Sequence, residues 1–187
     1  MTQASVAVQK ASMRDIPNLL ALINSYAANG IMLPRTEFEI SENIRDFSVA
    51  YDGNLLVGCG ALHFYTPTTA EVRSLAVLPA AKQQGIGRAV VNALEAEAQE
   101  NDLEAIFAFT YVLPFFKKLG FQEVERGELP LKVWKDCLRC PKFNSCDEIA
   151  VLKRLRPSRG EVIHSNYHEV RECELIHFPT IKSLIPQ

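Results

Sequence analysis

Hydrophobic and polar residues alternate along this chain with two periods, one typical of helices and the other of strands. Ile16, Leu19, Leu20 and Ile23, for example, recur at the 3.6-residue spacing of a helix. The apolar positions predict helices over 14–28, 37–45, 85–100 and 113–119, and strands over 6–10, 47–51, 55–64, 71–78, 104–109, 121–124 and 149–155. We therefore expect an α/β (α+β) fold, a mixed central sheet flanked by helices.

Turn signals divide this sheet into hairpins and one longer connection. Asp52-Gly53-Asn54 separates two strands and is a strong hairpin signal. Later, a strand, a helix and a strand follow each other through residues 71–109, which indicates a strand–helix–strand unit. Beyond residue 157 the periodicity weakens. We therefore expect a domain at 1–156 and an extension of unknown role at 157–187.

Composition narrows the class of protein. The 187 residues carry a net charge of −2, without the long basic run that nucleic acid would favour. No apolar stretch reaches the roughly 18 residues of a membrane span, and the first residues lack a signal-peptide core. Five cysteines are an odd number, which fits a reducing compartment. We expect a cytoplasmic protein without nucleic acid or membrane partners; its oligomeric state, a homodimer included, stays open.

The run from Ser74 to Arg88 is the most informative for chemistry. It joins a strand, a proline stop, a polar loop with Gly85 and Gly87, and an amphipathic helix. A helix N-terminus favours an anion, and glycine lets phosphate approach the backbone. A tight turn without a ligand is the simpler interpretation. The run is not a Walker loop, and it lacks the third glycine of the dinucleotide fingerprint.

Leu75-Ala-Val77 and Lys82-Gln-Gln-Gly-Ile-Gly87 resemble the acetyl-CoA motif of the GCN5-related N-acetyltransferases. Lys82 stands where that motif has Arg or Gln. Phe115-Phe-Lys-Lys-Leu-Gly-Phe121 resembles the family's second motif. The resemblance implies a fold that covers about residues 6–155, acetyl-CoA as co-substrate and chemistry that needs no metal. It also implies the cofactor-binding residues Leu75, Ala76, Val77, Lys82, Gln83, Gln84, Gly85, Ile86, Gly87, Arg88 and Phe116, and a 71–78 strand that splays from its neighbour to accept the pantetheine arm.

Further runs are similar to the short, kinase-less N-acetylglutamate synthases, which catalyse the first step of arginine synthesis. They are Gly30-Ile-Met-Leu-Pro-Arg35, Glu42-Asn-Ile-Arg-Asp-Phe47, Gly58-Cys-Gly-Ala-Leu-His63, the segment 128–142, and Cys146-Asp-Glu-Ile-Ala150. This resemblance implies that the chain transfers acetyl to the α-amino group of glutamate.

Glutamate carries two carboxylates, and arginine pairs with a carboxylate through two hydrogen bonds. By the resemblance, Arg35 grips one of them. Arg73, Lys132, Arg139 and Lys142 are candidates for the other. The alternative for each of these residues is a solvated surface charge.

Amine acetylation also needs a proton acceptor, because an ammonium must lose a proton before it attacks a thioester. Glu71 matches the position of the base in related synthases, and an ordinary strand-end carboxylate is the alternative. A backbone N–H near Leu75 to Val77 would meet the oxyanion. At the position of Phe116 many family members have a Tyr, which donates a proton to the departing CoA thiolate. In this chain Tyr111 or Thr110 would be that acid instead, or the thiolate would leave without a proton donor.

The cysteines and histidines are more simply explained by packing than by metal binding or catalysis. Cys137, Cys140 and Cys146 have an incomplete zinc spacing, with Cys173, His164 or His168 as a fourth ligand. We favour packing thiols and predict no metal. Cys59 fits the core, and His63 fits a structural role better than a base.

Two other functions remain: acetylation of another small amine, a polyamine or a protein N-terminus, or a silent acetyl-CoA sensor. The carboxylate-binding candidates argue against a polyamine, and Glu71 argues against a sensor.

Overall fold

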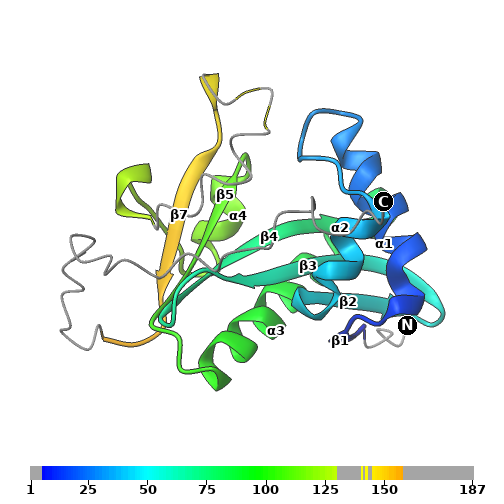
Figure 1. Cartoon of the computed structure of the whole chain (residues 1–187), viewed down its shortest axis with the longest axis horizontal. Coiled ribbons are helices and arrows are strands. Elements are labelled where there is room, and N and C mark those ends of the chain that lie inside the picture. The colour runs from blue at the N-terminus through cyan, green and yellow to red at the C-terminus, as the bar shows by residue number, and fades with distance from the viewer. Residues whose placement is uncertain (1–5, 130–139, 141, 143–144, 158–187) are drawn as a thin grey trace, which may run out of the picture. The chain divides into compact units, whose positions relative to one another are not determined.

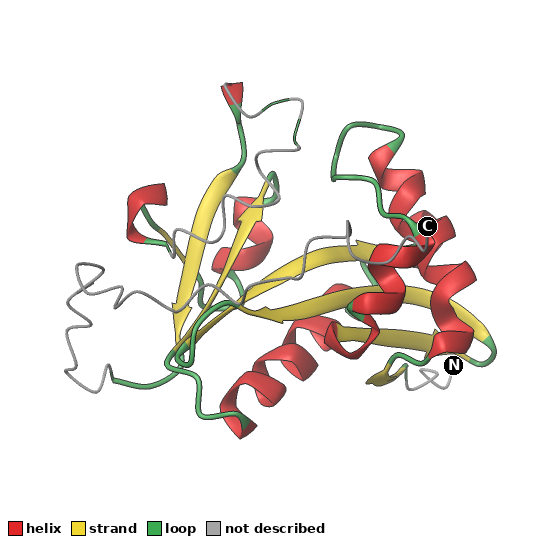
Figure 2. Ribbon diagram, in the orientation of Figure 1, coloured by secondary structure: helices red, strands yellow, loops and turns green. Residues whose placement is uncertain are grey.

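The computed structural model describes residues 6–129, 140, 142 and 145–157, which form a seven-stranded sheet with helices on both faces (Figure 1 and Figure 2). The strands are β1 (Ala7–Lys10), β2 (Phe47–Asp52), β3 (Leu55–Phe64), β4 (Thr69–Val77), β5 (Ala105–Thr110), β6 (Gln122–Glu123) and β7 (Ile149–Arg154). The α-helices are α1 (Ile16–Ala27), α2 (Glu37–Glu42), α3 (Ile86–Glu100) and α4 (Leu113–Lys117). Short 3₁₀ turns are η1 (Met13–Asp15), η2 (Ile44–Asp46), η3 (Pro79–Ala81) and η4 (Arg126–Glu128).

The sheet runs in the order β1-β2-β3-β4-β5-β7-β6. All neighbouring pairs are antiparallel except β4 and β5, which are parallel and joined through α3. This confirms the expected mixed sheet, the early hairpins and the strand–helix–strand unit. β7 enters between β5 and β6 after the segment 129–148, and this insertion has no signal in the local sequence pattern.

Two helical layers cover the sheet. The α3 side chains Ile86, Val90, Val91 and Leu94 form one hydrophobic cluster with one face. There the β3 glycines permit close contact, because a Cβ on Gly60 would lie 2.9 Å from the Val90 side chain. Helices α1 and α2 cover the opposite face, where Cys59 is fully buried, as expected. The sheet is therefore covered where β2, β3 and β4 lie.

Several element bounds differ from the sequence prediction, and the largest difference is in the helix expected over 37–45. The helix expected over 37–45 ends at Glu42, because the Asn43 side chain donates to the Glu39 carbonyl at 2.8 Å and its backbone leaves helical geometry. The chain then continues as η2. Strand β4 begins at Thr69, two residues earlier than expected, because the Tyr65 and Thr66 amides bond the Thr69 carbonyl and keep the connection from β3 short. β6 contains only two residues.

Among the described residues, no helix combines the length and the apolar composition needed to cross a bilayer. Residues 158–187 lie outside the described part of the chain. The domain boundary at 156 therefore stays a prediction.

Candidate active site

The loop before α3 has the geometry of an anion-binding helix start. Gly85 is the N-cap of α3 and adopts a left-handed conformation with φ of 81°. Gln83 also has a positive φ, 66°. Gly85 has no side chain that could cap the helix, so the first-turn N–H groups remain for another acceptor. Lys82, Gln83, Gln84 and Arg88 are exposed around this turn. The expected phosphate loop is therefore an open, positively polarised helix N-terminus.

Ile86 and Gly87 have packing roles within this loop. Ile86 is 2% exposed, and its side chain occupies the core beside Gly58. A Cβ on Gly87 would lie 3.4 Å from the Phe115 ring and 3.7 Å from a Val77 methyl group. Gly87 thus lets α3 pack closely against α4 and β4, a constraint that the sequence interpretation had not included.

Phe116 lies in the hydrophobic core. It is 3% exposed, and its ring makes edge contacts with Phe115 at 5.2 Å and with Phe121 at 5.1 Å between centroids. Its side chain therefore anchors α4 to the sheet.

Strands β4 and β5 part in the middle of the sheet, as Figure 1 shows. Their parallel pairing comprises Thr69 with Ala105, Ala70 with Ile106, and Glu71 with Phe107. β4 then continues to Val77 and β5 to Thr110, and in the described part of the chain the two strands make no further pairs with each other. The strand splay that the resemblance implied is thus present. Glu71, only 9% exposed, is the last β4 residue before the strands separate.

A β-bulge follows Glu71 on the same strand. Cys59 pairs with Ala76 and Ala61 with Arg73, so Ser74 and Leu75 together oppose Gly60. Ser74 has φ of 52°, unusual for a residue with a side chain. The bulge redirects the backbone of Leu75, Ala76 and Val77 just where β4 no longer pairs with β5.

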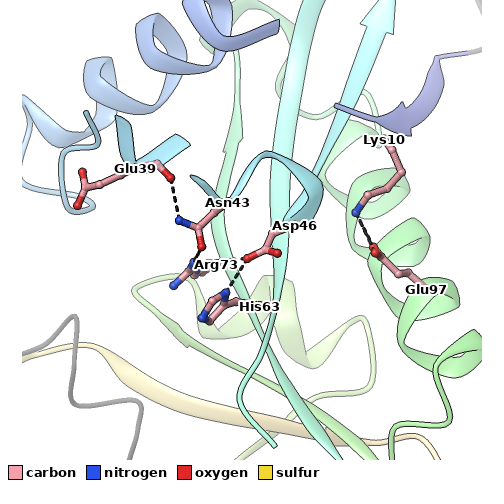
Figure 3. A network of polar contacts seen from close by, with 7 residues as sticks. All are labelled: Lys10, Glu39, Asn43, Asp46, His63, Arg73 and Glu97. Atoms are coloured by element: carbon pink, nitrogen blue, oxygen red, sulfur yellow. Dashed lines mark hydrogen bonds and ion pairs between the residues drawn. The ribbon is translucent and has the colours of Figure 1, made fainter. Parts of the chain in front are cut away.

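A polar network lies beside Glu71, and most of it is drawn in Figure 3. His63 on β3 is directly opposite Glu71 in the antiparallel register. Its Nδ1 lies 2.6 Å from Oδ2 of Asp46, the last residue of η2. The Arg73 guanidinium lies 3.6 Å from the same oxygen and 3.4 Å from Oδ1 of Asn43. A carboxylate, an imidazole and a guanidinium thus lie close together on the β3 side of Glu71.

Hydrogen bonds to the backbone of Arg35 anchor its loop to α1. The Asn24 side chain on α1 donates to the Arg35 carbonyl and accepts from the Arg35 N–H, both at 2.9 Å. Two residues along α1, the Tyr26 hydroxyl donates to the Val77 carbonyl at 2.6 Å. The Lys82 ammonium lies 5.0 Å from the centre of the Tyr26 ring. One end of α1 therefore positions the Arg35 loop, the end of β4 and the phosphate loop.

Tyr111 follows β5 and belongs to a surface cluster. Its hydroxyl donates to Asp147 at 2.9 Å and accepts from Lys142 at 3.1 Å. Burial raises the pKa of Tyr111, the Lys142 hydrogen bond opposes this, and the Asp147 carboxylate adds to it. The phenol therefore keeps its proton at neutral pH. Thr110 is buried, and its hydroxyl accepts the Val112 N–H.

Several candidates from the sequence lie outside the described residues. They are Lys132, Arg139 and Cys137, together with the proposed fourth ligands Cys173, His164 and His168. Cys140 and Cys146 are described and are free thiols. Because the zinc hypothesis includes Cys137, it stays a prediction.

Asp46, Asn43, Asn24 and Tyr26 were not singled out from the sequence. Asp46 is 17 positions from His63, and Tyr26 is 51 positions from Val77. These contacts arise only when the sheet and its covering helices assemble. The only sequence signal was the Glu42–Phe47 run within the family resemblance, which includes Asn43 and Asp46 but assigns them no role.

Known acetyltransferases are similar to this chain in sequence. An uncharacterized N-acetyltransferase from Chlorobaculum tepidum is 42% identical over 155 residues, which cover 83% of this chain and 100% of that protein. An amino-acid acetyltransferase from Mycobacterium tuberculosis is 33% identical over 135 residues, covering 71% and 77%.

Solved structures agree with the fold. N-acetylglutamate synthase from Neisseria gonorrhoeae, complexed with coenzyme A and N-acetyl-glutamate, has a TM-score of 0.75 at 28% identity. The match covers 83% of this chain but only 36% of that longer protein. A Mycobacterium tuberculosis protein in complex with CoA has a TM-score of 0.69 at 30% identity, covering 80% and 99%.

The resemblance stated from the sequence is confirmed. The splayed strands, the glycine loop before α3 and the buried Glu71 all lie within residues 16–121, which match the acetyltransferase (GNAT) family. The chain therefore belongs to the acetyltransferase (GNAT) family.

Proposed function

We propose that this acetyltransferase moves an acetyl group from acetyl-CoA to the α-amino group of L-glutamate. The observation that carries the proposal is Glu71, a carboxylate that is buried where β4 and β5 part and lies directly opposite His63 of β3. The relatives named amino-acid acetyltransferase and the synthase complexed with N-acetyl-glutamate support this acceptor. Synthesis of N-acetylglutamate, the first step of arginine synthesis, is the biological role that follows.

Acetyl-CoA would bind along the loop and the splayed strand. The backbone N–H groups from Gln83 to Arg88 would hold the pyrophosphate at the start of α3. The pantetheine arm carries amides, and these would pair with the β4 backbone beyond Glu71 as an added strand does. A backbone N–H between Leu75 and Val77, redirected by the bulge, would face the thioester oxygen.

Glutamate would bind on the face covered by α1 and α2. Arg35 is the first candidate to hold a carboxylate, because Asn24 fixes its backbone. Arg73 is a second candidate. Because its guanidinium lies near Asp46 and Asn43, a substrate carboxylate would share it with these two residues. Lys132 and Arg139 complete the proposed set.

The reaction requires an ordered movement of protons. Glu71 would remove one proton from the α-ammonium, directly or through water. The neutral amine then forms a bond to the acetyl carbon, the second N–H proton passes to solvent water, and the C–S bond breaks as the tetrahedral intermediate collapses to the amide and the CoA thiolate. The CoA thiolate would take its proton from Tyr111 or leave unassisted; the raised pKa of Tyr111 keeps a proton available there.

An acceptor panel tests this function. CoA release would be followed with L-glutamate, L-glutamine, L-aspartate, spermidine and a peptide with a free N-terminus, and the product would be identified by mass spectrometry. We expect the highest kcat/KM with L-glutamate. L-glutamine is the matched control, because it has the same shape and lacks the side-chain charge. Equal or higher kcat/KM with another amine would overturn the glutamate assignment.

A further inference from the structure

A buried general base must return its proton to water before the next turnover. Glu71 is only 9% exposed and lies between β3 and β5 in the sheet. If Glu71 accepts the proton of the α-ammonium, a neighbouring group with better access to solvent is needed to remove it. His63 is such a neighbour, because it is the direct cross-strand partner of Glu71 and its side chain is 30% exposed. Directly opposed residues of antiparallel strands place their side chains on the same face, close together.

The bond to Asp46 determines what the His63 ring can do (Figure 3). A carboxylate only accepts hydrogen bonds, so Nδ1 of His63 carries the hydrogen and donates it to Oδ2 of Asp46 at 2.6 Å. In the neutral ring the other nitrogen, Nε2, is then the proton acceptor. The ring of Tyr65 meets the imidazole edge-on, with centroids 4.9 Å apart, and restricts its orientation.

Charged side chains of η2 and β4 lie near His63 in the described part of the chain. They are the carboxylates of Asp46 on η2 and Glu71 on β4, and the Arg73 guanidinium on β4, which lies 3.6 Å from Asp46. The Asp46 carboxylate accepts the Nδ1–H hydrogen bond whether the ring is neutral or carries a second proton on Nε2. Asp46 can therefore orient the ring in both protonation states.

We propose that His63, oriented by Asp46, is the proton relay for Glu71. The Glu71 carboxyl group gives the proton taken from the acceptor amine to Nε2 of His63, and Glu71 becomes a carboxylate again. The imidazolium then releases this proton to water. The Nδ1 proton stays with His63 throughout. This proposal rests on the proposed role of Glu71 as base, and His63 acts through Glu71 without touching the acceptor.

A structural role is the competing explanation. The His63–Asp46 pair also ties η2 to β3, and a partly exposed pair of this kind contributes little to protein stability. Loss of the tie would lower the melting temperature. It would not make activity responsive to added base.

The experiment compares His63→Ala, His63→Gln and Asp46→Asn with wild type. It uses the amine that wild type acetylates best, whichever that is. We expect kcat to fall about tenfold or more in the His63 variants and less in Asp46→Asn, with KM for both substrates within twofold. Added imidazole should restore part of kcat in His63→Ala. The control is Glu97→Gln. This variant removes the ion pair between Lys10 on β1 and Glu97 on α3, whose charged atoms lie 2.8 Å apart, and should leave kcat unchanged.

A double-mutant cycle separates this proposal from the proposed function. If His63 acts through Glu71, the variant Glu71→Gln/His63→Ala should be no slower than Glu71→Gln alone. Wild-type kcat in a folded His63→Ala variant, or a loss that imidazole does not restore, would overturn the relay while Glu71 remained the base. Wild-type kcat in Glu71→Gln would instead overturn the base, and the relay with it.

Discussion

At the scale of single residues, the candidate site contains side chains and a loop that partners from other elements hold in place. Glu71 and Arg35 were singled out from the sequence, and the structure places Glu71 at the strand separation and Arg35 in an anchored loop. Asp46 and Asn24 were missed, because each acts on a residue from another element. A local pattern contains no signal for such a pairing.

The role of Arg35 can be tested by removing its side chain. Arg35→Ala should raise the glutamate KM about tenfold or more, because a hydrogen bond to a charged group contributes about 1.5–3 kcal/mol. Acetyl-CoA affinity should stay unchanged, since the phosphate loop is a separate segment. Steady-state kinetics and calorimetry measure the two effects. The control is Arg14→Ala, which removes an exposed arginine on η1.

Two related results would complete this test. Asn24→Ala frees the Arg35 backbone and should reproduce part of the rise in KM. Equal weakening of both substrates, or of neither, would show that Arg35 is not a selective carboxylate clamp.

At the scale of elements, strongly periodic segments were predicted well and irregular ones poorly. β3 was predicted with its observed bounds, and α3 differs by one residue because Gly85 is its cap. The helix expected over 37–45 failed at Asn43, where a side-chain hydrogen bond to the backbone ends α2. The strand splay was expected only through the family resemblance, because strand length and hydrophobicity do not show where pairing stops.

Gly87 tests the loop between β4 and α3. Gly87→Val should weaken acetyl-CoA binding tenfold or more, about 1.4 kcal/mol, because its methyl groups would press on the Phe115 ring and reshape the helix start. Calorimetry measures the affinity. Gly127→Ala is the control, since a Cβ there meets nothing within 4 Å. Unchanged affinity in a folded Gly87→Val variant would refute the phosphate-loop assignment.

At the scale of the whole molecule, the fold class was predictable and the strand order was not. Periodicity and turns predicted a mixed sheet with helices. The insertion of β7 between β5 and β6 joins residues from distant parts of the chain and follows from assembly of the core, where Val151 is fully buried. The match to the Chlorobaculum tepidum relative uses all of that protein but 83% of this chain.

The domain boundary predicts the result of a truncation. A chain that ends at Pro157 should keep its melting temperature and its kcat/KM within about twofold, because residues beyond 157 lack the periodicity of core elements. Thermal unfolding and the CoA-release assay measure both. A large loss of either would place the 158–187 segment within the catalytic domain.

The central claim is that Glu71, at the separation of β4 and β5, is the base that prepares the amine for acetylation. The most direct test is kcat/KM for glutamate as a function of pH in Glu71→Gln, which keeps the size of the side chain but cannot take the proton. We predict a fall of about a hundredfold at pH 7, within the 10² to 10⁴ of general base catalysis. The loss should shrink as pH rises, because more of the amine arrives neutral. Wild-type activity across the pH range would show that Glu71 is a structural carboxylate and not the base.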